Sequence, residues 1–178
     1  YCATCDGAFF RGRTVAVIGG GDVAVEDAIF LARGCEKVYL IHRRDELRAA
    51  KILQVALMKL PNVEILWDSQ LKEIQGEDQV DEILVYNKKT QQTDSLSVSG
   101  VFMAVGTIPN TALVKGMVEM DEKGYIVADE TCATSVCGIY AAGDVRTKHL
   151  RQIITAAAAE AFSEVTRPWS GMLTVKSQ

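Results

Sequence analysis

Long apolar runs are missing from this sequence. No stretch approaches the roughly 18–20 residues that a membrane-spanning helix needs, and no charged n-region followed by an apolar h-region marks a secretory signal. A basic excess is missing too, since 19 Lys and Arg against 23 Asp and Glu give a formal net charge of −4. A general nucleic-acid or anionic-membrane binder would need a net basic face. We therefore expect a cytoplasmic protein that binds neither nucleic acid nor membranes.

Cysteines are few and odd in number, five in 178 residues, which argues against a secreted disulfide framework. Cys2 and Cys5 form a Cys-x-x-Cys pair, which we interpret as redox-active. A structural zinc site needs a second pair at ligand spacing, and Cys132 and Cys137 are the only candidates. Zinc is the less favoured alternative, and we expect no metal. We interpret Cys35, Cys132 and Cys137 as small core residues.

The remaining composition is that of a globular protein, with 48% hydrophobic and 24% charged residues. The length fits one domain, or one domain with part of another. The chain begins at Tyr1 rather than Met, next to the Cys-x-x-Cys motif. We therefore expect a fragment of a longer protein.

Apolar strands and amphipathic helices alternate along the first part of the chain. The patterns predict strands at 13–18, 37–41 and 63–66, with helices at 22–33 and 47–60 between them. Strand, helix, strand, helix and strand in this order indicate a parallel, doubly wound sheet.

The hydrophobic period changes to two between residues 71 and 98. Three short strands are predicted there, at 71–74, 81–86 and 94–98, as an antiparallel meander inserted into the α/β unit. A continuous apolar strand at 101–105 then returns to the parallel sheet. The predicted fold class is therefore α/β, a Rossmann-like parallel sheet with an inserted antiparallel meander.

The chain beyond Pro109 lacks a strand–helix–strand unit of its own. It contains short predicted strands at 125–128 and 139–141, and an Ala-rich helix at about 151–165. We interpret this tail as part of another domain.

A Gly19-x-Gly21-x-x-Ala24 pattern lies at the first strand-to-helix turn. Glycines let the backbone approach a pyrophosphate, and the helix N-terminus supplies free N–H groups and a positive dipole. The pattern is weak alone, but the strand before it, the helix after it and the next strand are all in place. We predict dinucleotide binding in preference to a plain glycine-rich turn.

Basic residues follow the second strand, where an NAD site would place a carboxylate on the ribose 2′-hydroxyl. They are His42, Arg43, Arg44 and Arg48. Guanidinium groups match the oxygens of a 2′-phosphate, so we predict NADP binding. The alternative is a solvated basic cluster neutralised by Asp45 and Glu46.

The segment Cys2-Ala3-Thr4-Cys5-Asp6 has the spacing of a compact, reducible disulfide. The adjacent carboxyl of Asp6 could exchange protons with a thiolate. Together with an NADP-binding unit, such a pair has both a source and a sink for electrons.

At these motifs the chain resembles the bacterial-type, low-molecular-weight thioredoxin reductases of the pyridine nucleotide-disulfide oxidoreductase family. The matching segments, in order and at compatible spacing, are 2–7, 19–26, 42–49, 106–111, 142–145 and 151–152. This set is highly specific and covers essentially the whole chain. Asp22 and Val23 depart from the family, many members of which have an amide and a hydroxyl residue there.

The resemblance implies two domains: 1–110, with the redox motif and the NADPH-binding fold, and 111–178, the C-terminal part of an FAD-binding domain. It places Glu26, Val105 and Gly106 at the nicotinamide nucleotide. It also implies FAD contacts by a second set of residues: Gly143, Asp144, Val145, Arg151, Gln152 and Ile153.

By the same resemblance, Cys5 faces the flavin, Cys2 attacks the substrate disulfide and Asp6 serves as the acid. The implied function is electron transfer from NADPH through FAD and the Cys2–Cys5 pair to thioredoxin, in a homodimer. The family's earlier flavin-binding half, with its own glycine-rich turn, has no counterpart in the sequence. Two alternatives stay open: a truncated chain that only binds NADP(H), and a related flavoprotein that feeds a peroxiredoxin.

Overall fold

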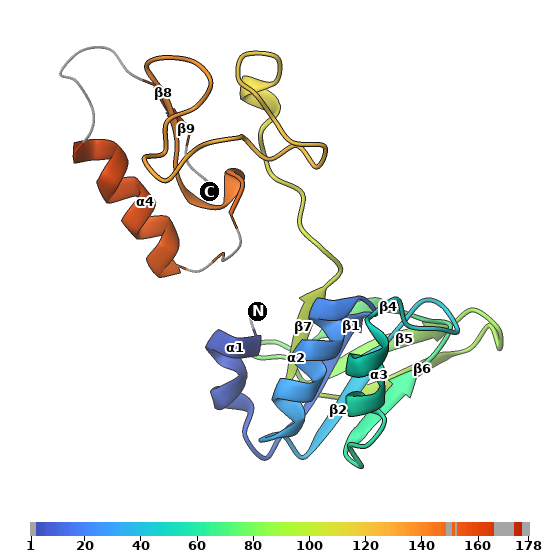
Figure 1. The fold of residues 1–178 in the computed structure, drawn as a ribbon. Helices are drawn as coiled ribbons and strands as arrows, with labels where there is room; N and C mark the ends of the chain where they lie inside the picture. Colours follow the sequence, from blue (N-terminus) through green and yellow to red (C-terminus); the bar gives the residue numbers. More distant parts are fainter. Residues whose placement is uncertain (1–2, 149–150, 152, 166–172, 176–178) are drawn as a thin grey trace. The chain divides into compact units, whose positions relative to one another are not determined.

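The computed structural model describes residues 3–148, 151, 153–165 and 173–175. The chain forms two compact units, Tyr1–Gly106 and Thr107–Gln178, whose elements are labelled in Figure 1. Whether these units are the predicted NADPH and FAD domains stays a prediction. Cys2 and Gln152, two of the predicted site residues, lie outside the described residues. Over the part that is described, no helix is long and apolar enough to cross a membrane.

A four-stranded parallel sheet organises the first unit, with the strand order β3-β2-β1-β7. Its strands are β1 (Thr14–Gly19), β2 (Lys37–Ile41), β3 (Val63–Leu66) and β7 (Gly100–Ala104). Val15 of β1 pairs with Val38 on one side and Gly100 on the other. The predicted Rossmann-like α/β class is confirmed, because each apolar run forms a strand within one residue of its predicted bounds.

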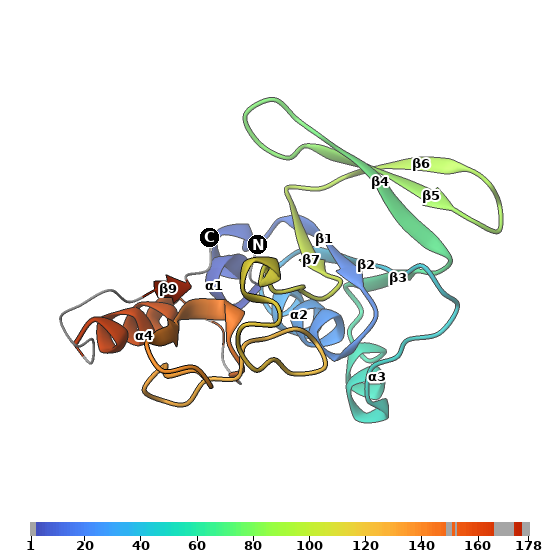
Figure 2. The same ribbon diagram turned by 90° about the horizontal axis from the view of Figure 1, so that it is seen from above.

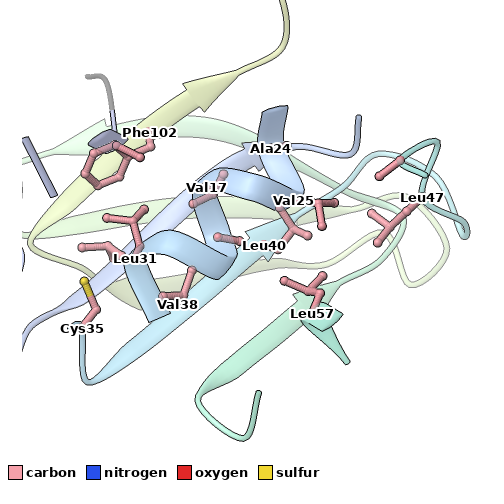
Figure 3. Packing of buried hydrophobic residues seen from close by; sticks show 14 residues of the cluster. Val17, Ala24, Val25, Leu31, Cys35, Val38, Leu40, Leu47, Leu57 and Phe102 are labelled. Atoms are coloured by element: carbon pink, nitrogen blue, oxygen red, sulfur yellow. The ribbon is translucent and has the colours of Figure 1, made fainter. Parts of the chain in front are cut away.

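Side chains of β1 alternate between the two faces of this sheet. Val15 and Val17 pack into a core with the helices, whereas Ala16 and Ile18 pack on the opposite face. The helices are α1 (Ala3–Asp6), α2 (Asp22–Ala32) and α3 (Lys51–Leu57). The 3-10 turn η1 (Gly7–Phe10) lies between α1 and β1. Figure 3 shows the helical side, where Leu31 of α2 lies near Phe102 of β7.

The antiparallel meander covers the other face. It consists of β4 (Ser69–Gln75), β5 (Glu82–Asn87) and β6 (Thr93–Ser97), in the order β4-β5-β6. Ile83 and Val85 of β5 are buried against Ile18 and Ile41 of the parallel sheet, and the turn between β4 and β5 stands clear of it (Figure 2). The predicted meander is confirmed. The doubly wound arrangement is wrong in one respect, because strands and not helices cover this second face.

The second helix is shorter than the predicted 47–60. Leu47 and Ala49 are buried as expected of a helical stripe, but they lie in a non-helical segment. The backbone there bonds to the glycine-rich turn, since the Ala50 N–H donates to Asp22 Oδ1 at 2.7 Å and the Arg48 N–H donates to the Gly20 carbonyl at 2.8 Å. These bonds compete with helical ones, and α3 begins only at Lys51.

The second unit has little regular structure. Its elements are η2 (Ala112–Val114), β8 (Ile139–Ala141), η3 (Gly143–Val145), α4 (Ile153–Val165) and β9 (Leu173–Val175). The strand at 139–141 is confirmed, and it pairs in parallel with β9, which was not predicted. The strand predicted at 125–128 is wrong: Ile126 forms isolated bridges to Met120 and Arg146, because the backbone bonds of this segment go to several partners.

The aromatic contact at the centre of the first unit gives a stability prediction. Phe102 is 0% exposed and meets the Phe10 ring edge-on, with centroids 5.3 Å apart. Phe102→Ala should lower the free energy of unfolding by about 3–5 kcal/mol, because it removes an aromatic ring and leaves a cavity. Urea unfolding of both proteins measures the change. Ile74→Ala, at a half-exposed position of the meander, is the control, and an equal loss in the two variants would contradict the assignment.

Candidate functional site

A cavity of about 430 Å³ opens at the carboxyl edge of the parallel sheet. Four segments line it: Ile18, Gly19 and Gly20 after β1; Ile41, His42, Arg43 and Arg48 after β2; Ser69, Gln70 and Leu71 in β4; and Met103, Ala104 and Val105 at the end of β7. Its volume lies within the range of ligand pockets. In open parallel sheets, ligands bind at this edge.

The glycine-rich turn forms one wall of this cavity. At two of its glycines the neighbouring atoms lie so close that no side chain would fit. A Cβ on Gly19, whose φ is +154°, would lie 2.5 Å from the Ala104 carbonyl oxygen and 2.7 Å from Ala24 Cβ. A Cβ on Gly20 would overlap the His42 ring, whereas one on Gly21 would meet open space. Gly21 is the N-cap of α2 and has no side chain to occupy the first N–H groups. These donors are thus available to an anion.

Asp22 and Val23 begin α2 and differ in what they offer a ligand. The Asp22 carboxylate accepts the Ala50 N–H, so it fastens the turn to the start of α3. Val23 is 62% exposed and has no polar group, whereas Ala24 is fully buried under the turn. The side chains of these three residues therefore add no hydrogen-bond donor for a phosphate.

His42 is 4% exposed and packs into the wall of the cavity. Its Nε2 donates to the Glu46 carbonyl at 3.0 Å, and its ring lies edge-on to Trp67 with centroids 6.4 Å apart. Because the same ring abuts Gly20, His42 joins the glycine-rich turn to the loop after β2.

Three arginines around this loop are exposed: Arg43, Arg44 and Arg48. Neither Asp45 nor Glu46 forms an ion pair with them within the described part of the chain; Asp45 instead faces Lys89 at 3.9 Å. The alternative of a self-neutralised cluster therefore loses its support, and the guanidinium groups stay available to a ligand.

The cavity brings together only some of the predicted cofactor residues. Gly19, His42, Arg43, Arg48 and Val105 line it. The others in this unit, which do not line it, are Gly21, Asp22, Val23, Ala24, Glu26, Arg44 and Gly106. Sequence reasoning missed the wall made by β4. The only signal for it is the polar Ser69-Gln70 pair, which follows β3 after Trp67 and Asp68.

Residues 3–6 of the redox motif form α1, at the start of the same unit. Ala3 is buried in the core that α2 shares, whereas Cys5 is exposed and Asp6 is half-buried. The following turn is fixed by Phe10, whose ring fills the space that a Cβ on Gly100 would need. The motif is therefore attached to the parallel sheet, and Cys5 is accessible to a partner.

The predicted flavin segment begins with η3 in the second unit. Gly143 has a φ of +82°, and the carboxylate of Asp144 pairs with Lys148 Nζ at 3.0 Å. The guanidinium of Arg151 lies over the Tyr125 ring, 4.2 Å from its centroid. Val145 is buried and Ile153 is 89% exposed.

The later cysteines divide into two kinds. Cys35 and Cys132 are buried as predicted, their thiols donate to the carbonyls of Phe10 and Ala159 at 3.3 Å, and burial raises the pKa of both. Cys137 is exposed, so its interpretation as a core residue is wrong. Among the residues that the structure describes, no three His, Cys, Asp or Glu side chains are grouped to hold a metal ion.

Comparison with known proteins agrees with these motifs. The model of the pyridine nucleotide-disulphide oxidoreductase family matches residues 1–161. The chain belongs to this family. It is 47% identical to the thioredoxin reductase of Borreliella burgdorferi over 157 residues, which are 88% of this chain and 48% of that protein. It is 43% identical to the thioredoxin reductase of Peptoclostridium acidaminophilum over 164 residues, 89% of this chain and 52% of that one.

Comparison with solved structures agrees with this family. The crystal structure of thioredoxin reductase from Streptococcus pyogenes superposes with a TM-score of 0.84 and 49% identity, over 93% of this chain and 55% of that one. The predicted family resemblance is confirmed. The chain spans about half the length of the curated relatives that it matches.

Asp22 gives a prediction for this family's nucleotide site. Asp22→Asn keeps an oxygen for the Ala50 N–H but removes a negative charge beside the expected pyrophosphate, so a dinucleotide should bind about two- to fivefold tighter at low salt. Titration calorimetry at 20 and 300 mM NaCl measures this, and the gain should shrink at high salt. Asp22→Ala should instead weaken binding, because it releases the Ala50 N–H. A gain with both variants would contradict this role of the carboxylate.

Proposed function

We propose that the first unit binds NADPH in the cavity at the glycine-rich turn. The observation that carries the proposal is the set of exposed arginines, Arg43, Arg44 and Arg48, which lack carboxylate partners among the described residues. The pyrophosphate would lie at the N-terminus of α2, and the 2′-phosphate, with about two negative charges, would lie among the guanidinium groups. The open space at Gly21 fits a ligand in that position.

The proposed activity of the whole protein is that of a thioredoxin reductase. NADPH would supply a hydride, and FAD would pass its two electrons on. In the second unit the residues proposed to hold FAD are Gly143, Asp144, Val145, Arg151, Gln152 and Ile153. Exposed Ile153 and the positive φ of Gly143 are compatible with a ligand at this segment.

The cysteine pair would carry the exchange with the substrate. The Cys2 thiolate attacks the partner disulfide, which gives a mixed disulfide and one leaving thiolate. The Cys5 thiolate then attacks Cys2, so the Cys2–Cys5 disulfide forms and the second partner thiolate leaves. Two electrons pass to the partner, and Asp6 supplies one of the two protons that its thiolates take up. The exposure of Cys5 supports access for a protein of this kind.

Thioredoxin is the proposed substrate, since relatives such as that from Treponema pallidum, 46% identical over 156 residues, are named thioredoxin reductase. A homodimer in the cytoplasm belongs to the same proposal. The visible spectrum of the purified chain separates it from a unit that only binds NADP(H). A yellow protein that oxidises NADPH and reduces thioredoxin supports the reductase, and a colourless one that binds NADPH supports the binding unit. Reduction of a peroxiredoxin partner in place of thioredoxin supports the other alternative, a related flavoprotein that feeds a peroxiredoxin.

Removal of two arginines tests the NADPH assignment. The double variant Arg43→Ala with Arg44→Ala should weaken the binding of NADPH at least about tenfold, because two charge-assisted hydrogen bonds are lost. It should change the affinity for NADH less than about threefold. Quenching of intrinsic fluorescence measures both dissociation constants. Arg13→Ala with Arg33→Ala removes the same charge at the opposite edge of the sheet and serves as the control. Equal losses for the two nucleotides would rule out a 2′-phosphate site.

Thiol titration tests the redox pair. Mild oxidation of the folded chain should lower the number of reactive thiols, counted after denaturation, by two of the five cysteines. Treatment with a dithiol should restore both thiols. Cys5→Ser should abolish this change, whereas Cys137→Ser should preserve it. Mass spectrometry after alkylation identifies the residues. A bond that includes Cys132 or Cys137 would overturn the assignment.

A further inference from the structure

Residues 42–48, which follow β2, are called the arginine loop here. Three of its consecutive carbonyls accept hydrogen bonds from the meander and from the turn that leads into it. The His42 carbonyl accepts the Ser69 N–H at 2.9 Å, and the Arg44 carbonyl accepts the Asp68 N–H at 3.1 Å. Between them, the Arg43 carbonyl accepts a hydrogen bond from Lys88 Nζ at 3.3 Å. The backbone of the loop is therefore held from one side, and its guanidinium groups do not take part in these bonds.

The hairpin that carries Lys88 is itself fastened to the same place. The Lys88 N–H donates to the Asp68 carbonyl at 2.8 Å, and Lys89 Nζ pairs with Asp68 Oδ2 at 2.9 Å. Asn87 Nδ2 donates to the Trp67 carbonyl at 3.2 Å. The turn between β5 and β6 thus cannot move away from the arginine loop without loss of several bonds.

The charges of the two neighbouring lysines are used differently. Lys89 is paired with Asp68, and Asp45 lies 3.9 Å from it. Lys88 has no ion pair with a carboxylate in the described ranges, and its contact is a neutral carbonyl. Its ammonium group therefore serves the backbone of the loop at Arg43 and not an acidic neighbour.

We infer that the meander is part of the nucleotide site and that Lys88 is a positioning residue, which orients Arg43 for a 2′-phosphate and so favours NADPH over NADH. This role rests on the proposed NADPH function. It explains why an antiparallel sheet stands where a second helical layer would stand: its first strand lines the cavity, and its hairpin reaches the loop that carries the guanidinium groups.

Binding of NADPH and NADH to the purified chain tests the inference without any activity measurement. Lys88→Met should weaken the binding of NADPH about three- to tenfold, which corresponds to the loss of one exposed charge-assisted hydrogen bond. The affinity for NADH should stay within about twofold of the wild-type value. Lys88→Arg should restore most of the loss, because it keeps a cationic donor. Lys72→Met removes the same charge from the exposed side of β4, where Lys72 lies over the Tyr86 ring, and should change neither constant. Thermal unfolding of each variant shows that the fold is kept.

A double-mutant cycle separates positioning from a general charge effect. Because Lys88 acts through Arg43, Lys88→Met should cost less than about twofold in NADPH affinity once Arg43 is Ala. A full additive loss in that background, or an equal loss with Lys72→Met, would overturn the positioning role and leave the NADPH site intact. A wild-type chain that binds NADPH and NADH equally would overturn the proposed function itself.

Discussion

The proposed nucleotide site depends on the close approach of backbones where β1 ends. At Gly19 the chain passes so near the Ala104 carbonyl and Ala24 that any larger residue would force β7 or α2 outward. At Gly20 the His42 ring occupies the space of a side chain, and so fixes the loop after β2. Strand, helix and loop therefore meet at one point, where Gly19, Gly20 and two of the arginines, Arg43 and Arg48, line the same cavity. The positions of Arg48 and of the start of α3 follow, since Gly20 and Asp22 supply their hydrogen-bond acceptors.

The two faces of the parallel sheet have different consequences for the site. The helical face packs α1 and η1 into the core, so the exposed Cys5 belongs to the same compact unit as the candidate cavity. The other face is covered by β5, whose Ile83 and Val85 are buried against the sheet. This packing places β4 at the cavity and the following hairpin at the arginine loop. A helical layer would cover the same apolar area, but it would bring neither Ser69 nor Lys88 to the carbonyls of residues 42–44.

Hydrophobic patterns predicted the regular elements well, and local motifs predicted the glycine and arginine positions. β2 and β3 have their predicted bounds, because each is a short, largely apolar run that begins directly after a polar residue. The pattern failed at Leu47 and Ala49, since buried side chains in a loop and on a helix face look alike when the competing bonds come from Gly20 and Asp22. It failed again around Ile126, which is buried but whose backbone bonds go to Val145 and Thr147, outside any strand. Lys88 could not be found at all, because the contact with Arg43 spans 45 positions and depends on the register of the meander.

The electrostatic potential at the cavity depends more on the charged residues close to it than on the net charge of the protein. The protein is acidic overall, with a formal net charge of −4, and this would disfavour a highly anionic nucleotide at long range. Charges beyond a Debye length of about 8 Å are largely screened at physiological salt, so the residues around one loop dominate the local potential. There the acidic groups Asp45 and Asp68 lie at Lys89, and the arginines keep their charge. A carboxylate moved from Lys89 to Arg43 would leave the net charge unchanged and would abolish the field that the 2′-phosphate requires.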